Sequence, residues 1–189
     1  MNHYTSAAFD TVDYDIFIDH RWKAFGIDGA VPSWIKSFIH ERTQLIVVAG
    51  HESSQSAINC GVPHGSVLGT ILFLLYTVDV TMITHKHGLD AHSYADGTQL
   101  HFDYKPNSCS SWLPRLALCN DEIDKWMSAN RLKLNAIKTQ LIWLGTRQQL
   151  AKVNYRSVNL NGVDLQSSAD VTCIGVVFYS DMNFVKHIR

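Results

Sequence analysis

The stretch Ala91-His92-Ser93-Tyr94-Ala95-Asp96-Gly97-Thr98-Gln99-Leu100-His101 has the pattern of two short strands that meet at a tight turn. Residue types alternate with a period near two, as in a strand, and Asp96-Gly97 is a strong signal for a hairpin turn. Such a turn places the Asp96 carboxylate at the tip of a hairpin, where a metal ion or a substrate can reach it. An Asp-Gly pair is also a common turn with no further role, so the rest of the chain must decide between the two interpretations.

The composition is that of a folded protein without a strong electrostatic character. The chain has 189 residues, of which 46% are hydrophobic, and 16 Lys and Arg stand against 17 Asp and Glu. This length can form one domain with a substantial core. The near-neutral charge argues mildly against strong independent binding of nucleic acid, although a local basic groove remains open. The four cysteines form no C-x-x-C pair, so we expect reduced thiols in an intracellular protein, nuclear or cytoplasmic and not secreted.

Helical and strand patterns follow one another without regular βαβ alternation, which indicates an α+β fold with an antiparallel sheet. Apolar periodicity predicts helices over about 16–25, 31–39, 67–84 and 108–129. Strands are expected over 1–10, 43–49, 55–60, 140–144 and 171–178, with a second hairpin over 157–165 around an Asn-Gly turn. The longest apolar run, 67–80, falls short of the about 20 residues that a membrane span needs, so we interpret it as a buried helix and expect no membrane association.

Four stretches, in this order and spacing, resemble the reverse transcriptases of non-LTR (LINE-type) retrotransposons. They are Ser6–Asp13, Gly61–Gly69, Tyr94–Leu100 and Leu134–Thr139, and Cys173–Val176 is similar to the family's Leu-Gly-Val segment at the palm–thumb junction. Each motif alone is a weak signal, but the ordered set covers essentially the whole chain. The resemblance implies a polymerase palm-type antiparallel sheet flanked by helices. It also implies a partial reverse transcriptase domain over residues 1–189 that ends at the palm–thumb junction, with fingers and thumb largely missing.

The resemblance further implies a reaction and a cofactor. The family is an RNA-directed DNA polymerase that joins nucleotides on an RNA or DNA primer–template with the help of two Mg²⁺ ions. Because two hard cations need clustered oxygen ligands, the family supplies three aspartates. Asp96 keeps one of these metal ligands, whereas Tyr4 and Gly97 stand where the other two are expected. A neutral phenol cannot replace an anionic ligand, so the sequence predicts a catalytically inactive chain and puts Mg²⁺ binding in doubt.

Other positions match family residues that face the nucleotide. Phe9 matches the bulky residue that screens against a ribose 2′-hydroxyl, and Lys138 matches a lysine that faces the phosphates or protonates the leaving group. A core aromatic and a solvated charge are equally open interpretations of these two residues. Four residues match the loop behind the nucleotide and template, with histidine in place of a glutamine: Pro63, His64, Gly65 and Ser66.

Three hypotheses follow from these departures. The first is a reverse transcriptase-like palm without polymerase activity. The second is a non-catalytic nucleic-acid-binding or interaction remnant, in which Lys133 and Lys138 contact a primer–template. The third is a chain that is not stably folded, because absent fingers would leave apolar palm surface exposed. The sequence does not fix the oligomeric state.

Two further patterns have simple interpretations. A cluster of acidic residues fits the first turn of a helix, where the helix dipole favours negative charge. It consists of Asp10, Asp13, Asp15 and Asp19. Three tryptophans are expected in the core rather than in a platform that stacks bases. They are Trp112, Trp126 and Trp143.

Overall fold

The computed structural model describes residues 1–5, 7–18, 25–63, 65–103, 109–160 and 162–182. Its helices are η1 (Ala8–Asp10), α2 (Ala30–Ile39), α3 (Val67–Lys86), α4 (Cys109–Ala129) and α5 (Arg147–Leu150), and residues 14–18 are also helical. Its strands are β1 (Asn2–Tyr4), β2 (Arg42–Gln44), β3 (Val47–Val48), β4 (His51–Glu52), β5 (Ser56–Ile58), β6 (Asp90–Tyr94), β7 (Gly97–His101), β8 (Leu141–Ile142), β9 (Ser157–Leu160), β10 (Val163–Ser168), β11 (Asp170–Cys173) and β12 (Val176–Tyr179).

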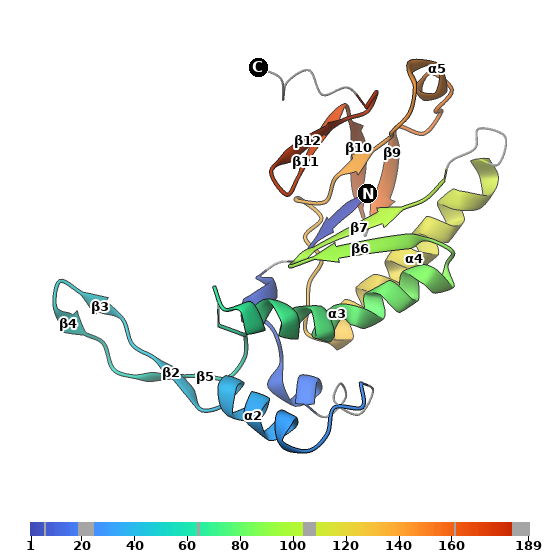
Figure 1. The fold of residues 1–189 in the computed structure, drawn as a ribbon. Helices are drawn as coiled ribbons and strands as arrows, with labels where there is room; N and C mark the ends of the chain where they lie inside the picture. Colours follow the sequence, from blue (N-terminus) through green and yellow to red (C-terminus); the bar gives the residue numbers. More distant parts are fainter. Residues whose placement is uncertain (6, 19–24, 64, 104–108, 161, 183–189) are drawn as a thin grey trace.

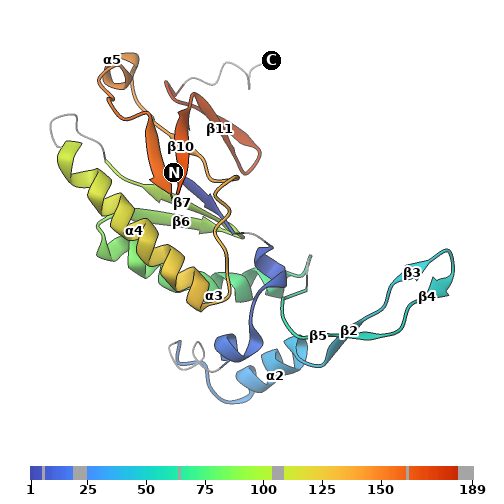
Figure 2. The same cartoon turned by 180° about the vertical axis from the view of Figure 1, so that it is seen from behind.

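The centre of the fold is an antiparallel sheet in the order β1-β7-β6. Helix α3 packs against β6, and α4 packs against α3, so that the two helices lie side by side beneath the β6–β7 hairpin (Figures 1 and 2). Exposure alternates along β6, as the period of two predicted. The mixed α+β class expected from the sequence is confirmed.

The hairpin turn lies one residue earlier than predicted. Tyr94 pairs with Gly97, so Ala95 and Asp96 are the two loop residues, and Ala95 takes the left-handed conformation with φ +50°. Gly97 is the first residue of β7, where it is also paired with Tyr4 of β1. Because of this pairing, Gly97 has a strand conformation, and Ala95 has the positive φ instead. The left-handed conformation of an alanine costs about 1 kcal/mol of folding free energy.

Helix α3 supplies much of the core. Leu72, Phe73 and Tyr76 are buried, and the Tyr76 hydroxyl donates to the backbone carbonyl of Asn130 at 2.7 Å. The helix has 20 residues and, by length and composition alone, meets the requirement for crossing a membrane. The expectation that it is too short was therefore wrong, because the helix continues to Lys86. We expected a buried helix, and this holds for one face only, since Val67, Ile71 and Met82 are exposed.

Helix α4 forms the second layer with α3. It runs without a break through Pro114, which the sequence suggested would interrupt or delay it. Pro114 lies in the second turn of the helix. The backbone hydrogen bond that proline cannot donate, and the contact of its ring with the preceding turn, are therefore both close to the start of the helix. Trp112 is buried on this helix, and two other tryptophans pack against the core, as expected: Trp126 and Trp143.

The strands that come after β7 in the sequence, β8 to β12, form two small sheets. The predicted hairpin over 157–165 is confirmed, with Leu160 paired to Val163 and Gly162 at φ +83°. Strand β8 joins β10 in a parallel pair, so this three-stranded sheet is mixed. Strands β11 and β12 form a separate hairpin whose Cys173 side chain accepts a hydrogen bond from Gln99 of β7.

A two-stranded arm over residues 42–58 projects from the helical layer (Figure 1). It consists of the pairs β2–β5 and β3–β4 in place of the predicted continuous strand over 43–49. Four apolar side chains along it are exposed: Leu45, Ile46, Val47 and Val48.

Candidate functional site

The sheet brings together the three positions that match the family's metal aspartates. Tyr4 is the direct partner of Gly97 in the β1–β7 register. One residue further along, the backbone amide of Thr5 donates to the carbonyl of Asp96 at 3.2 Å. Thr5 also forms an isolated antiparallel bridge with Leu134, at the start of the fourth motif. The third and fourth motifs, which are far apart in the sequence, therefore meet at the end of β1, directly before the first motif.

The second motif is fixed against the first by backbone contacts. The amide of Gly61 donates to the carbonyl of Val12 at 2.8 Å, and that of Val62 donates to the carbonyl of Phe9 at 2.7 Å. Gly61 has φ +84°, and a Cβ atom there would lie 2.9 Å from the Asp10 Cα atom. Only glycine combines this conformation with so close an approach of two backbones.

A buried tyrosine closes this contact from the other side. The Tyr14 hydroxyl donates to the carbonyl of Gly61 at 2.7 Å, and burial raises the pKa of the phenol above its usual value. Tyr14 is the first residue of the helix that follows the first motif. The helix and the Gly61 loop are thus joined by a hydrogen bond between residues 47 positions apart.

The loop expected behind the nucleotide leads directly into α3. Ser66 is the N-cap residue, since its Oγ atom accepts from the amide of Gly69 at 2.9 Å. The same hydroxyl donates to the carbonyl of Pro63 at 2.8 Å, so the loop is bonded to the helix that it starts. Gly65 has φ +73°, with open space where a side chain would be. His64 lies outside the described residues.

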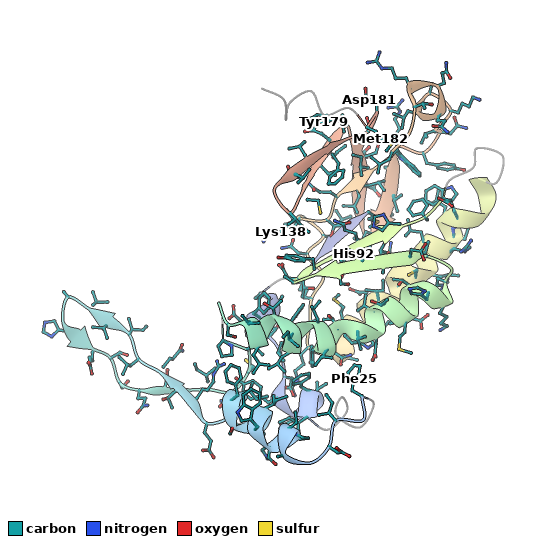
Figure 3. The ribbon with its side chains drawn as sticks, in the orientation of Figure 1. Phe25, His92, Lys138, Tyr179, Asp181 and Met182 are labelled. Carbon is teal, nitrogen blue, oxygen red and sulfur yellow. The ribbon has the colours of Figure 1, made fainter. Side chains whose placement is uncertain are left out.

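Phe9 and Lys138 have different surroundings. The Phe9 ring is half-buried and tilted against Phe73 of α3, with 5.1 Å between ring centroids. Lys138 is exposed on a tight turn, and its backbone amide donates to Asn135. Figure 3 shows Lys138 beside the end of the sheet where β6 and β7 meet. The structure therefore places Lys138 near the hairpin tip (Figure 3), whereas Phe9 is part of the packing on α3.

The nearby carboxylates do not complete a metal site. Asp10 is exposed on η1, whereas Asp13 is buried and engaged elsewhere. Within the described ranges, no group of three or more His, Cys, Asp or Glu residues is placed to hold a metal ion. At the three matching positions the donor set is one carboxylate, of Asp96, beside a tyrosine and a glycine. This set lacks the anionic oxygen ligands that two Mg²⁺ ions need.

Asp13 has a structural role that the sequence showed only in part. Its Oδ1 atom accepts from the amide of Ile16 at 2.9 Å, which caps the helix over 14–18, and its Oδ2 atom lies 2.5 Å from the guanidinium of Arg131. The acidic first turn was thus predicted correctly for Asp13, whereas Asp10 precedes the helix and Asp19 lies outside the described residues. The cap has a local signal, but the contact with Arg131 has none.

Comparisons of the sequence with known proteins identify the family. A family model for reverse transcriptase (RNA-dependent DNA polymerase) matches residues 5–176. The RNA-directed DNA polymerase from mobile element jockey of Drosophila melanogaster is 28% identical over 159 residues, which are 82% of this chain and 17% of that protein. The probable RNA-directed DNA polymerase from transposon BS of the same species is 27% identical over an alignment 189 residues long, which covers 96% of this chain and 20% of that protein.

The chain thus spans about a fifth of the length of these curated relatives. Nearly all of it lies within the family match. The third and fourth motifs contact the chain at the end of β1, and the second motif contacts the first. The chain belongs to the reverse transcriptase family and is related to the RNA-directed DNA polymerases of non-LTR retrotransposons.

Proposed function

We propose that residues 1–189 are the palm part of a reverse transcriptase domain, ending at the junction with the thumb, and that this chain does not catalyse nucleotide transfer. The observation that carries the proposal is the register of the central sheet. It sets Tyr4 opposite Gly97 and next to Asp96, so the two replaced positions are the neighbours of the one that is retained.

The chemistry explains why one carboxylate is too few. Two Mg²⁺ ions, when bound, clamp the attacking and leaving oxygens of an in-line phosphoryl transfer. Each ion needs several oxygen ligands in near-octahedral geometry, and anionic ligands offset the cost of removing its water. Asp96 alone can contribute to one ion. A tyrosine phenol ordinarily has a pKa of about 10 and is no anionic ligand at neutral pH, and Gly97 has no side chain.

The backbone around the site is compatible with the family aspartates. Gly97 is a paired strand residue, so an aspartate there needs no unusual backbone conformation. Tyr4 is likewise a strand residue. These features support the view that the scaffold is intact and that the defect lies in the side chains.

Primer extension on an RNA template with Mg²⁺ tests the proposal. We expect no extension by the native chain and measurable extension by a triple variant with Tyr4→Asp, His64→Gln and Gly97→Asp. Adding Asp96→Ala to the triple variant should abolish that activity. Extension by the native chain that is lost with Asp96→Ala would show that one carboxylate suffices, and the proposal would be wrong.

Metal binding gives a readout that does not depend on the rest of the polymerase. Electron paramagnetic resonance of free Mn²⁺ measures the affinity of each chain for this ion. We expect the triple variant to bind Mn²⁺ at least about tenfold more tightly than the native chain, because each added carboxylate brings an anionic ligand. Equal affinities would place the defect outside these three side chains.

A second candidate function is nucleic-acid binding without catalysis. The exposed side chains of Lys133 and Lys138, on the turn that bridges to β1, favour it. Binding to an RNA or DNA primer–template should then weaken with salt, and each lysine replaced by glutamine should reduce the slope of log K against log salt by about 0.9. A flat response to salt would argue against this function.

A further inference from the structure

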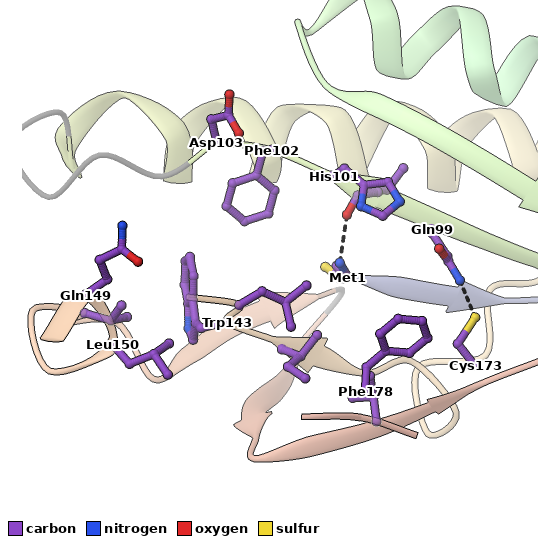
Figure 4. Close-up of a pocket in the computed structure, with 15 residues that line it drawn as sticks. Met1, Gln99, His101, Phe102, Asp103, Trp143, Gln149, Leu150, Cys173 and Phe178 are labelled. Atoms are coloured by element: carbon purple, nitrogen blue, oxygen red, sulfur yellow. Dashed lines mark hydrogen bonds between the residues drawn. The ribbon is translucent and has the colours of Figure 1, made fainter. Parts of the chain in front are cut away.

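A cavity of about 590 Å³ lies at the far end of β7 from Asp96. Strand β7 begins at Gly97, beside Asp96, and ends at His101, which lines the cavity. The lining residue of β7 nearest to Asp96 is Gln99, about 7 Å from Gly97 along the strand at about 3.3 Å per residue, and neither Asp96 nor Gly97 is among the described lining residues. The other walls come from β8, α5 and the β11–β12 hairpin (Figure 4). The cavity is thus distinct from the polymerase-type site, and no step of the proposed function uses it.

Aromatic rings form much of the wall. Figure 4 shows the rings of Phe102, Trp143 and Phe178 around the cavity. Phe102 meets Trp143 edge to face, with 5.8 Å between centroids and 89° between planes. On the core side, Phe102 stacks on Trp112 at 5.0 Å, which holds this wall in place. The volume falls within the range of about 300–1,000 Å³ that is usual for small-molecule sites with apolar and aromatic linings.

The polar groups are few, and most lie at the two ends, with the Met1 amine and the His101 ring between them (Figure 4). Asp103 and Gln149 lie at one end, and at the other Gln99 donates to the Cys173 thiol (Figure 4). Burial lowers the pKa of His101, so this imidazole is neutral at pH 7. No Lys or Arg side chain lines the cavity among the residues that the structure describes. The amine of Met1 also lines the cavity, where it donates to the carbonyl of Leu100 at 2.7 Å. Burial lowers the pKa of this amine to about 6, so it offers an anion little positive charge at pH 7, whereas Asp103 can accept a hydrogen bond.

We propose that this cavity binds a flat, uncharged aromatic molecule of two or three fused rings, with a hydrogen-bond donor directed at Asp103. The rings pack edge or face against Phe102, Trp143 and Phe178, an arrangement that adds to the energy of simple burial. The donor meets the one side chain with a formal negative charge in the lining, which favours a hydroxyl or amine over a plain hydrocarbon.

The compound 2-naphthol serves as the probe, because it has two fused rings and one hydroxyl donor. Saturation-transfer NMR and quenching of tryptophan fluorescence with the full chain should give a dissociation constant on the order of 0.1 mM, as expected for a ligand of this size. The anion 2-naphthoate should bind at least tenfold more weakly.

Three variants locate the site. Leu144→Trp fills the cavity from an exposed lining position, 53% exposed, and should abolish binding. Leu118→Trp, at a similarly exposed position on α4 outside the cavity lining, is the matched control and should leave the dissociation constant unchanged. Asp103→Ala should weaken 2-naphthol about fivefold without affecting 2-methoxynaphthalene, which has no donor. Circular dichroism and thermal unfolding confirm that each variant is folded.

The outcomes are distinct. No binding of 2-naphthol by the folded native chain would overturn the proposal, as would equal binding by the native chain and Leu144→Trp. A loss of both naphthalene ligands in Asp103→Ala would refute the assigned direction of the donor. None of these readouts depends on polymerase activity, so failure here leaves the proposed function untouched.

Discussion

Asp13 stabilises the first motif chiefly as a helix cap and only secondarily as an ion pair. It is 6% exposed, and its Oδ1 atom accepts from the amide of Ile16 at 2.9 Å. Its second oxygen meets Arg131, whose side chain is 72% exposed and therefore well hydrated. Water around Arg131 screens its attraction to Asp13, so we expect the ion pair to contribute less to the free energy of unfolding than the helix cap does.

The expected magnitudes separate the two contributions. Replacing an N-cap aspartate by alanine costs about 0.5–2 kcal/mol, and an ion pair with an exposed partner contributes about 0–1 kcal/mol. Asp13→Ala, which removes both, should therefore lower the free energy of unfolding by about 2 kcal/mol. Asp13→Asn keeps an oxygen that accepts from Ile16 and should cost about 1 kcal/mol or less. Arg131→Met removes only the pair and should cost about 0.5 kcal/mol.

Urea unfolding followed by circular dichroism measures these differences, with Asp15→Ala as the control in the same first turn. Asp15 is exposed, so its replacement should change the free energy of unfolding by less than about 0.5 kcal/mol. A loss of about 3–5 kcal/mol for Arg131→Met would refute the reasoning, because that is the cost of leaving a buried carboxylate uncompensated. The charge pair, rather than the cap, would then dominate.

Three further changes test other parts of the fold. Tyr76→Phe removes the buried hydrogen bond to Asn130 and should lower the free energy of unfolding by about 1–2 kcal/mol in the same urea assay, whereas no change would mean that this bond adds nothing. The hydrogen bond from Lys86 is the main cause that lowers the pKa of Glu122, so its stabilising effect is present above the unfolded pKa of about 4.3 and is lost as the pH falls through the lower folded value. The native chain and Glu122→Gln should therefore differ at pH 7 and converge in acid, and a gap that widens in acid would contradict this sign. Ile46→Lys on the exposed arm should raise solubility in light-scattering assays without changing thermal stability, and unchanged aggregation would show that the arm is not its source.

The sequence predicted those features that depend on local pattern. The helices over 31–39 and 109–129 follow from apolar periodicity, and the Asn-Gly turn gave the second hairpin correctly. Ser66 as a cap, followed by an apolar run, marks the start of α3. The motif order also predicted the family, because the spacing of four short segments is a property of the chain alone.

The features that the sequence did not predict depend on contacts between residues that are far apart in the chain. Asp96-Gly97 has the local signal of a turn, yet the pairing of Gly97 with Tyr4, 93 positions away, moves the turn to Ala95 and Asp96. The contact between Asp13 and Arg131 is likewise set by where α4 ends. Strand pairing and close packing override local propensity because they involve more backbone hydrogen bonds than a single turn residue can offset.

The contacts that join β1 to the hairpin turn, and the first motif to the second, include backbone hydrogen bonds that do not depend on the side chains at positions 4 and 97. Thr5 bonds to Asp96, and Gly61 bonds to Val12, through main-chain atoms alone. Tyr4 and Gly97 also contribute to the sheet as backbone partners. Three carboxylates held close together repel one another unless cations neutralise them, so a complete metal site carries a cost in stability. Replacing two of the three removes that repulsion and leaves every one of these backbone bonds in place. Under the loss of activity that we propose, folding and catalysis therefore depend on different atoms of the same residues, so the fold can be kept while the catalytic carboxylates are not.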